Sequence, residues 1–142
     1  MTPLLDVNVL VALAWPTHVH HAEAVNWFSD HLPATWATAS VAQAGFLRVS
    51  SNRKVLGDAR SPAEAAAVLR ALTELDGHVL WNDDLDLVRS PGMSFDSLRG
   101  YRQVTDAHLL ALATLHDGRL VTFDRGVADL ADTPDRVTLL SL

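Results

Sequence analysis

Residues 3–14 read Pro3-Leu4-Leu5-Asp6-Val7-Asn8-Val9-Leu10-Val11-Ala12-Leu13-Ala14, and this stretch decides the fold. Its first three residues form a short apolar run that predicts a buried strand ending at Asp6. The run from Val7 is apolar enough to be a buried helix, which Trp15-Pro16 stops because proline cannot continue a helix. A strand that passes directly into a helix is typical of a βαβ unit, so a parallel sheet is expected.

The same alternation of strands and helices continues along the chain. Ser61-Pro62-Ala63-Glu64 is a strong helix start, since Ser61 can cap, proline fits the first helical position and Glu64 can return the capping bond. Short apolar strands without a clean polar face indicate a mainly parallel sheet covered by helices on both sides, a three-layer α/β/α sandwich. The other elements expected are helices over 20–32, from 40 to about 49, from 62 to before Gly77 and from 105 to before Asp117, and strands over 34–39, 78–81, 119–123 and 136–140.

Length and composition fit one compact domain. The chain has 142 residues, 49% hydrophobic and 20% charged, so a single domain over residues 1–142 is expected. It has no cysteine, which leaves carboxylates, histidines or hydroxyls to carry any catalysis. No run approaches the ~20 apolar residues of a membrane span and residues 1–15 hold no basic leader, so a cytoplasmic protein is expected. The net charge of −6 argues against bulk electrostatic binding of nucleic acid.

Three aspartates fall where functional groups collect in such sheets, beyond the carboxyl ends of the strands. Asp6 ends the first strand, Asp124 ends the strand from Arg119, and Asp106 opens the helix that leads into that strand. Each could simply cap its helix, because βα loops commonly end in a capping residue. Three carboxylates packed together would repel one another and push a proton onto one of them, so a divalent cation, Mg²⁺ or Mn²⁺, is expected between them.

Several stretches of the chain resemble the signature blocks of PIN-domain nucleases, and more narrowly those of VapC-type toxins. The resemblance runs from residue 3 to about residue 127, with the blocks in the right order and spacing. The matching stretches are Leu4–Leu10, Thr105–Ala113 and Leu120–Asp124, and Trp36–Thr38 with Gly45–Val49 is similar to the second block of these toxins.

The resemblance implies a PIN-like fold and a role for each matching residue. Asp6, Asp106 and Asp124 would be the catalytic carboxylates that hold the metal. Asn8 would hold the first loop in shape, and Thr122 would support the site by hydrogen bonding.

The resemblance also implies an activity and partners. The expected activity is that of a Mg²⁺- or Mn²⁺-dependent endoribonuclease, the toxin of a type II toxin–antitoxin system, acting on structured RNA such as tRNA or rRNA. In the hypothesised reaction, a metal-activated water attacks the phosphodiester in line and leaves a 5′-phosphate and a 3′-hydroxyl. A homodimer is expected, as is inhibition by a small VapB-type antitoxin whose arm covers the acidic site.

The chain departs from the family pattern at Gln43, where a Glu on the helix after the second strand is usual. The site then carries about one negative charge less, which weakens a second divalent ion more than the first. Three explanations stay open: Gln43 returns a capping-box bond to the Ser40 amide, it orients a metal-bound water, or a Glu to Gln change silences a toxic enzyme. The alternative function is therefore a weak or inactive PIN-like module that binds metal and RNA.

Arginines and one long connection are the candidates for RNA contact. Arginine forks suit phosphate, although each arginine is equally explained as an ordinary surface residue. Residues 82–104 are long for a connection in a compact domain, so a hidden short helix or a flap over the carboxylates is expected. The arginines that could reach RNA near the site are Arg48, Arg99, Arg102 and Arg125.

Two other kinds of chemistry fit the sequence less well. His18, His20 and His21 form a cluster, but adjacent helical residues point about 100° apart and would not converge on one metal. A haloacid-dehalogenase-type phosphatase also begins with a strand and an aspartate, but it needs a second acid where Asn8 stands.

Overall fold

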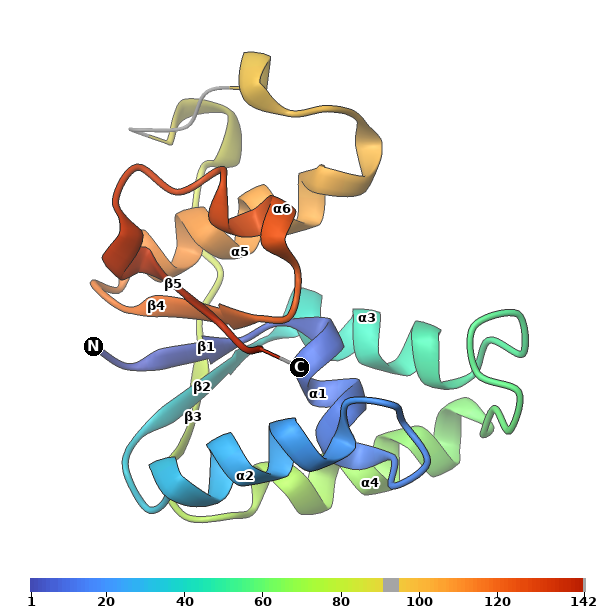
Figure 1. Ribbon diagram of the computed structural model, residues 1–142. Coiled ribbons are helices and arrows are strands. Elements are labelled where there is room, and N and C mark those ends of the chain that lie inside the picture. Colours follow the sequence, from blue (N-terminus) through green and yellow to red (C-terminus); the bar gives the residue numbers. More distant parts are fainter. Residues whose placement is uncertain (91–94, 142) are drawn as a thin grey trace.

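The computed structural model describes residues 1–90 and 95–141, and its centre is an all-parallel sheet of five strands (Figure 1). The order across the sheet is β3-β2-β1-β4-β5, so β1 lies in the middle, with Leu4 beside Ala37 on one side and beside Leu120 on the other. The α/β expectation is confirmed. The strands are β1 (Pro3–Leu5), β2 (Trp36–Ala39), β3 (His78–Trp81), β4 (Arg119–Thr122) and β5 (Val137–Leu139).

Helices cover both faces of the sheet. Figure 1 shows α5 and α6 on one face, whereas α1 to α4 pack against one another on the other face. The α-helices are α1 (Val7–Ala14), α2 (His21–His31), α3 (Ser40–Ser50), α4 (Pro62–Thr73), α5 (Val104–Leu115) and the short α6 (Arg125–Ala128). The connections between them contain the 3₁₀ helices η1 (Leu87–Arg89), η2 (Phe95–Ser97), η3 (Tyr101–Gln103) and η4 (Pro134–Arg136).

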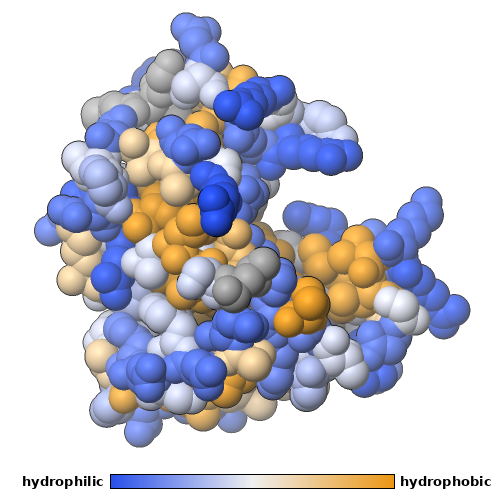
Figure 2. All heavy atoms as spheres, viewed as in Figure 1, coloured by the Kyte–Doolittle hydropathy of each residue, from blue (hydrophilic) through white to orange (hydrophobic). Residues whose placement is uncertain are grey.

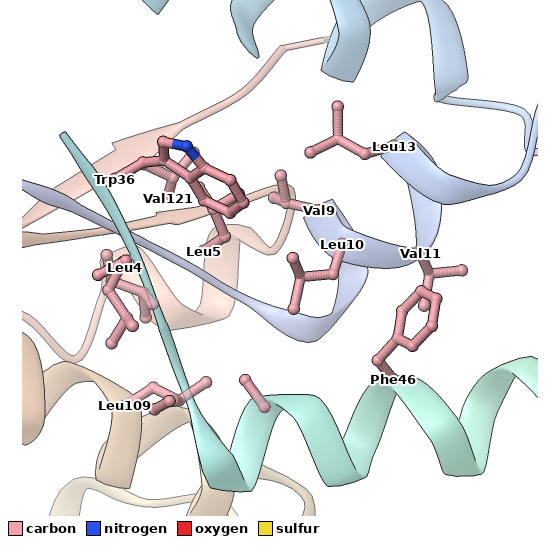
Figure 3. Packing of buried hydrophobic residues seen from close by; sticks show 14 of the residues in the cluster. Leu4, Leu5, Val9, Leu10, Val11, Leu13, Trp36, Phe46, Leu109 and Val121 are labelled. Carbon is pink, nitrogen blue, oxygen red and sulfur yellow. The ribbon is translucent and has the colours of Figure 1, made fainter. Parts of the chain in front are cut away.

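The core lies between the sheet and the two helix layers. Leu5, Val9 and Trp36 are fully buried together, and Phe46 of α3 lies beside Val11 of α1 (Figure 3). On the other face, Leu109 anchors α5 against the sheet with no exposed surface. Each such leucine or valine stabilises the fold by roughly 1.5–3 kcal/mol, so this packing holds the strand ends in place.

The expected elements are all present, with ends shifted by one or two residues in most cases. The strand expected from Ala34 begins at Trp36, and the helix expected from Thr105 begins at Val104. The connection from 82 to 103 contains η1, η2 and η3, as its length indicated. None of the helices within residues 1–90 and 95–141 has the length and apolarity needed to cross a membrane.

Candidate functional site

The winding of the sheet reverses beside β1, and this places the carboxyl ends of β1 and β4 side by side. The chain runs outward from β1 to β2 and β3, and then returns to the other side of β1 as β4. Ligands of open α/β sheets bind at such a switch point. Figure 2 shows a hollow at this side of the molecule, between the segment that precedes α5 and the α3–α4 end of the lower layer.

Asp6 is the most enclosed of the three predicted carboxylates. It caps α1, is 4% exposed and accepts hydrogen bonds at 2.7 Å from the Val7 amide and from Thr122 Oγ1. Burial raises the pKa of its carboxyl, the two hydrogen bonds lower it in part, and the charge of Asp124 raises it further. The surroundings of Asp6 therefore favour its protonated form, and a positive charge nearby would favour the ionised one.

Asn8 and Thr122 tie the ends of β1 and β4 together. Asn8 Nδ2 donates to Thr122 Oγ1 at 3.1 Å, and Asn8 Oδ1 accepts from the Phe123 amide at 3.2 Å. The Thr122 hydroxyl, which donates to Asp6, also accepts from the Asp124 amide at 3.1 Å. Every hydrogen-bonding capacity of this hydroxyl is thus used to hold the two acidic loops together.

Asp124 and Asp106 complete the group. Asp124 is exposed and caps α6 by accepting a hydrogen bond from the Gly126 amide at 2.8 Å. Asp106 lies in the first turn of α5, half-buried, and its carboxylate makes no hydrogen bond or ion pair with a described residue. Burial and the charges of Asp6 and Asp124 raise its pKa to about 6. Helix capping therefore accounts for two of the three aspartates and leaves Asp106 unexplained.

The donor chemistry of this group fits a hard divalent cation. Its members are carboxylates, which Mg²⁺ and Mn²⁺ prefer, and their mutual repulsion is what a cation would relieve. In the described part of the chain no three His, Asp or Glu side chains are arranged so that they could together hold one metal ion. The three aspartates are thus an electrostatically coupled group rather than a closed coordination shell.

Gln43 lies in the first turn of α3, but it does not form the capping box. Ala39 is the N-cap residue of α3, no side chain caps this helix, and Ser40 is already helical. The capping-box explanation is therefore wrong. Gln43 Nε2 instead donates to Thr38 Oγ1 at 3.1 Å, because the side chain turns back toward β2.

The four predicted RNA-contact arginines lie on separate segments of the described chain: α3, the segment before α5, and α6. Arg48 is in the last turn of α3, Arg102 is in η3, and Arg125 is in the first turn of α6. The Arg99 amide donates to Gln103 Oε1 at 2.7 Å, which folds the segment back toward the start of α5. All four side chains are exposed, and none forms an ion pair with another described residue.

Sequence reasoning assigned no role to Thr38, His78 or Asp83, whose contacts exist only in the folded chain. His108 Nε2 lies 2.6 Å from Asp83 Oδ2, which places the start of the long connection against α5. Thr38 Oγ1 lies 2.8 Å from His78 Nε2 and accepts a hydrogen bond from Gln43 Nε2, so Thr38 joins the other two residues. Nothing in the spacing of these residues links them, since each pairing joins separate elements. The histidines at 18, 20 and 21 form no metal group within the described ranges; His20 instead stacks on Phe123 with ring centroids 5.0 Å apart.

Known proteins match this chain over most of its length. The PIN domain family model matches residues 4–133. Ribonuclease VapC39 of Mycobacterium tuberculosis is 50% identical over 131 residues, covering 92% of this chain and 94% of the relative. Ribonuclease VapC38 of the same organism is 52% identical over 128 residues, covering 90% and 89% of the two chains.

A solved structure supports the fold independently. The crystal structure of M. tuberculosis VapC20, described as a sarcin-ricin loop cleaving toxin, superposes with a TM-score of 0.66 at 18% identity, covering 95% of this chain and 99% of that one. At this identity the likeness supports the fold alone. The similarity in sequence is that to VapC39 and VapC38, at 50% and 52% identity.

Proposed function

The chain belongs to the PIN-domain family and, within it, to the VapC ribonuclease toxins of toxin–antitoxin systems, and from that premise we propose that it is a Mg²⁺- or Mn²⁺-dependent endoribonuclease whose metal is held by Asp6, Asp106 and Asp124. Residues 1–142 act as one domain in this proposal, since a single sheet joins residues 3 to 139.

The observation that carries the proposal is the carboxyl group of Asp106. It is half-buried, has no hydrogen-bond donor among the described residues, and faces the charges of two other aspartates. A group held this way destabilises the folded chain unless a cation offsets the repulsion. Structural roles explain Asp6 and Asp124 as caps, whereas Asp106 caps no helix and has only the favourable first turn of α5 to offset the charges of the other two.

Each residue of the site has one task in the proposed reaction. Asp6, Asp106 and Asp124 supply the negative oxygens, and Asn8 and Thr122 hold the β1 and β4 loops at a constant separation. When bound, the divalent cation supplies a hydrolytic water of lowered pKa and neutralises charge that builds on the phosphoryl oxygens. Attack in line on the phosphodiester leaves a 5′-phosphate and a 3′-hydroxyl.

The proposed substrate is structured RNA, such as tRNA or rRNA. The net charge of −6 gives RNA little bulk electrostatic attraction, so the proposal assigns the phosphate contacts to exposed arginines. Arg99 and Arg102 stand on the segment before α5, and Arg48 stands on α3 across the hollow. An RNA strand crossing the hollow would meet positive charge on both sides of the acidic group.

The family also supplies the proposed partners. The proposed partners are a second copy of the chain, forming a homodimer, and a VapB-type antitoxin that inhibits it; membership of the VapC toxins supports the antitoxin. An antitoxin arm that enters the hollow would cover the acidic group and compete with RNA for the same arginines.

Cleavage of a labelled tRNA pool under single-turnover conditions with Mn²⁺ tests the proposed function. The unmodified chain should cut, Asp6→Asn should not, and Asp30→Asn should cut normally because Asp30 lies in the last turn of α2, away from the site. Equal cutting by Asp6→Asn and the unmodified chain would sink the metal-nuclease proposal. A parallel reaction with rRNA distinguishes the two substrate classes.

The alternative function is a module that binds metal and RNA without efficient turnover, and Gln43 is the observation that favours it. Gln43 supplies no negative charge where the family pattern has a Glu. If the unmodified chain never cuts and Gln43→Glu does, the alternative holds.

A further inference from the structure

Gln43 occupies the position where the family pattern has a Glu. Its side chain belongs to a hydrogen-bonded link that joins α3, β2 and β3. Gln43 Nε2 of α3 donates to Thr38 Oγ1 of β2 at 3.1 Å. Thr38 Oγ1 in turn lies 2.8 Å from Nε2 of His78 on β3. Thr38 has no exposed surface, so its hydroxyl must find its partners within the protein.

The direction of this link follows from what each atom can do. An amide nitrogen only donates, so Thr38 Oγ1 accepts from Gln43. The hydroxyl then has one proton to donate, and within residues 1–90 and 95–141 the remaining hydrogen-bonding atom beside it is His78 Nε2. Burial lowers the pKa of His78, so its ring is neutral and Nε2 can accept. With Thr38 as the donor and Nε2 as the acceptor, the ring proton of His78 lies on Nδ1.

α3 starts directly after β2, which runs parallel to and beside β1, so the first turn of α3 lies at the same edge of the sheet as Asp6. A Cβ added at Gly45 would lie 2.7 Å from Val7 Cγ2, so α3 and α1 are in close contact there. Val7 directly follows Asp6 in the chain. Gln43 precedes this contact by two residues. The nitrogen of the Gln43 side-chain amide is bound to Thr38, whereas its carbonyl oxygen has no hydrogen-bond partner among the described residues.

We propose that Thr38 and His78 are positioning residues that hold the Gln43 amide by its nitrogen and leave its carbonyl oxygen as the free end at the acidic site. This inference rests on the proposed metal-dependent activity of that site. An oxygen is the end of an amide that a hard cation, or a water in its shell, can use. Gln43 then contributes an oriented oxygen to the site and is more than the loss of a Glu charge.

A glutamate at position 43 would reverse the donor and acceptor roles in both hydrogen bonds of this link. A carboxylate only accepts, so Thr38 would donate its proton to it, and His78 would have to donate to Thr38 through an Nε2–H. The position of one proton on the His78 ring therefore reports the direction of the whole link.

Ring-nitrogen NMR of the full-length, metal-free chain at pH 7.5 measures that proton directly. We expect His78 to carry it on Nδ1 in the unmodified chain and in Thr38→Ser, and on Nε2 in Gln43→Glu. His116, which stacks on Trp81 at 4.3 Å, is the control within the same spectra and should not change. An Nε2–H tautomer in the unmodified chain, or one tautomer in both, overturns the proposed direction.

Calorimetry with Mn²⁺ alone tests the consequence for the site. Thr38→Val should weaken Mn²⁺ binding about tenfold, the lower end of the effect of removing an outer-shell partner, and Thr38→Ser should restore it. Thr73→Val, at the end of α4, is the matched control. Unchanged Mn²⁺ affinity in Thr38→Val overturns the positioning role. If the unmodified chain binds no Mn²⁺ while His78 shows the expected tautomer, the proposed function fails and the orientation of Gln43 stands.

Discussion

The Thr122 hydroxyl donates a 2.7 Å hydrogen bond to Asp6 Oδ2, joining two residues 116 positions apart in the chain. Both side chains are buried, and the same hydroxyl accepts from Asn8 and from the Asp124 amide. The Thr122 oxygen thus bonds to residues of both acidic loops, so a change at Thr122 alters both.

Thr122→Val should destabilise the fold by about 2–3 kcal/mol. It keeps the shape of the side chain but removes the hydroxyl that binds Asn8 Nδ2, the Asp124 amide and Asp6 Oδ2. Urea unfolding with and without Mn²⁺ measures this loss. Thr122→Ser retains the hydroxyl and should lose much less. Equal losses in the two variants would mean that packing of the methyl group, and not the hydroxyl, matters here.

The stability of the metal-free chain should fall as pH rises from about 4 to 6. The pKa of Asp106 is about 6 in the folded chain and about 4 unfolded. Within that window the folded chain holds a proton that the unfolded chain has released, so the free energy of unfolding declines. The decline is on the order of 1 kcal/mol, since solvent screens part of the repulsion at this half-buried group.

Asp106→Asn tests this pH dependence, because it removes the raised carboxyl. Thermal melts in EDTA should show a flatter profile and a higher Tm above pH 6 than the unmodified chain. Asp30→Asn should reproduce the unmodified profile. A decline of the same size in Asp106→Asn would mean that Asp106 is not the group responsible.

Divalent metal should reverse this loss of stability. Mn²⁺ binds the ionised carboxylates, so it should raise the Tm more at pH 7.5 than at pH 5. At 100 times the Kd the gain is about 2.7 kcal/mol. Asp6→Asn, Asp106→Asn and Asp124→Asn should each reduce the gain, whereas Asp30→Asn should keep it. A gain that survives all three substitutions would place the metal elsewhere.

Gly45→Ala should damage the packing beside Asp6. The new Cβ would meet Val7 Cγ2 at 2.7 Å, and overpacking of this kind costs about 1–3 kcal/mol. Adding Val7→Ala should recover part of the loss, because it removes the atom in conflict. Gly57→Ala is the matched control, since nothing lies within 4 Å of its added Cβ. Chemical denaturation of the single variants and of the Gly45→Ala, Val7→Ala double variant measures the free energy of unfolding of each and checks this order of stability.

Arg99→Ala with Arg102→Ala should weaken RNA binding and leave Mn²⁺ binding unchanged. Both side chains are exposed on the segment before α5. If each guanidinium neutralises one phosphate of single-stranded RNA, the slope of log K against log salt should drop by roughly 0.7 for each arginine removed. Arg70→Ala on α4 is the control. An unchanged slope would show that the RNA path avoids this segment.

Short-range patterns were enough to predict most of the fold. The apolar run of β1 and the Ser61-Pro62 start of α4 depend on neighbours in sequence, and both were found where expected. The start of α5 was misplaced by one residue, because Gln103 in η3 leads directly into the helix and no side chain caps it. The ends of elements depend on packing that a sequence does not display.

The sequence by itself determined the parallel sheet, the edge at which Asp6, Asp106 and Asp124 gather, and the departure at Gln43, because alternation of strands and helices dictates where strand ends meet. Only the tertiary structure decided that Asp106 is the carboxylate no cap explains and that Gln43 turns back to Thr38 and His78. Burial, and hydrogen bonds between residues far apart in the chain, exist only once the layers have packed.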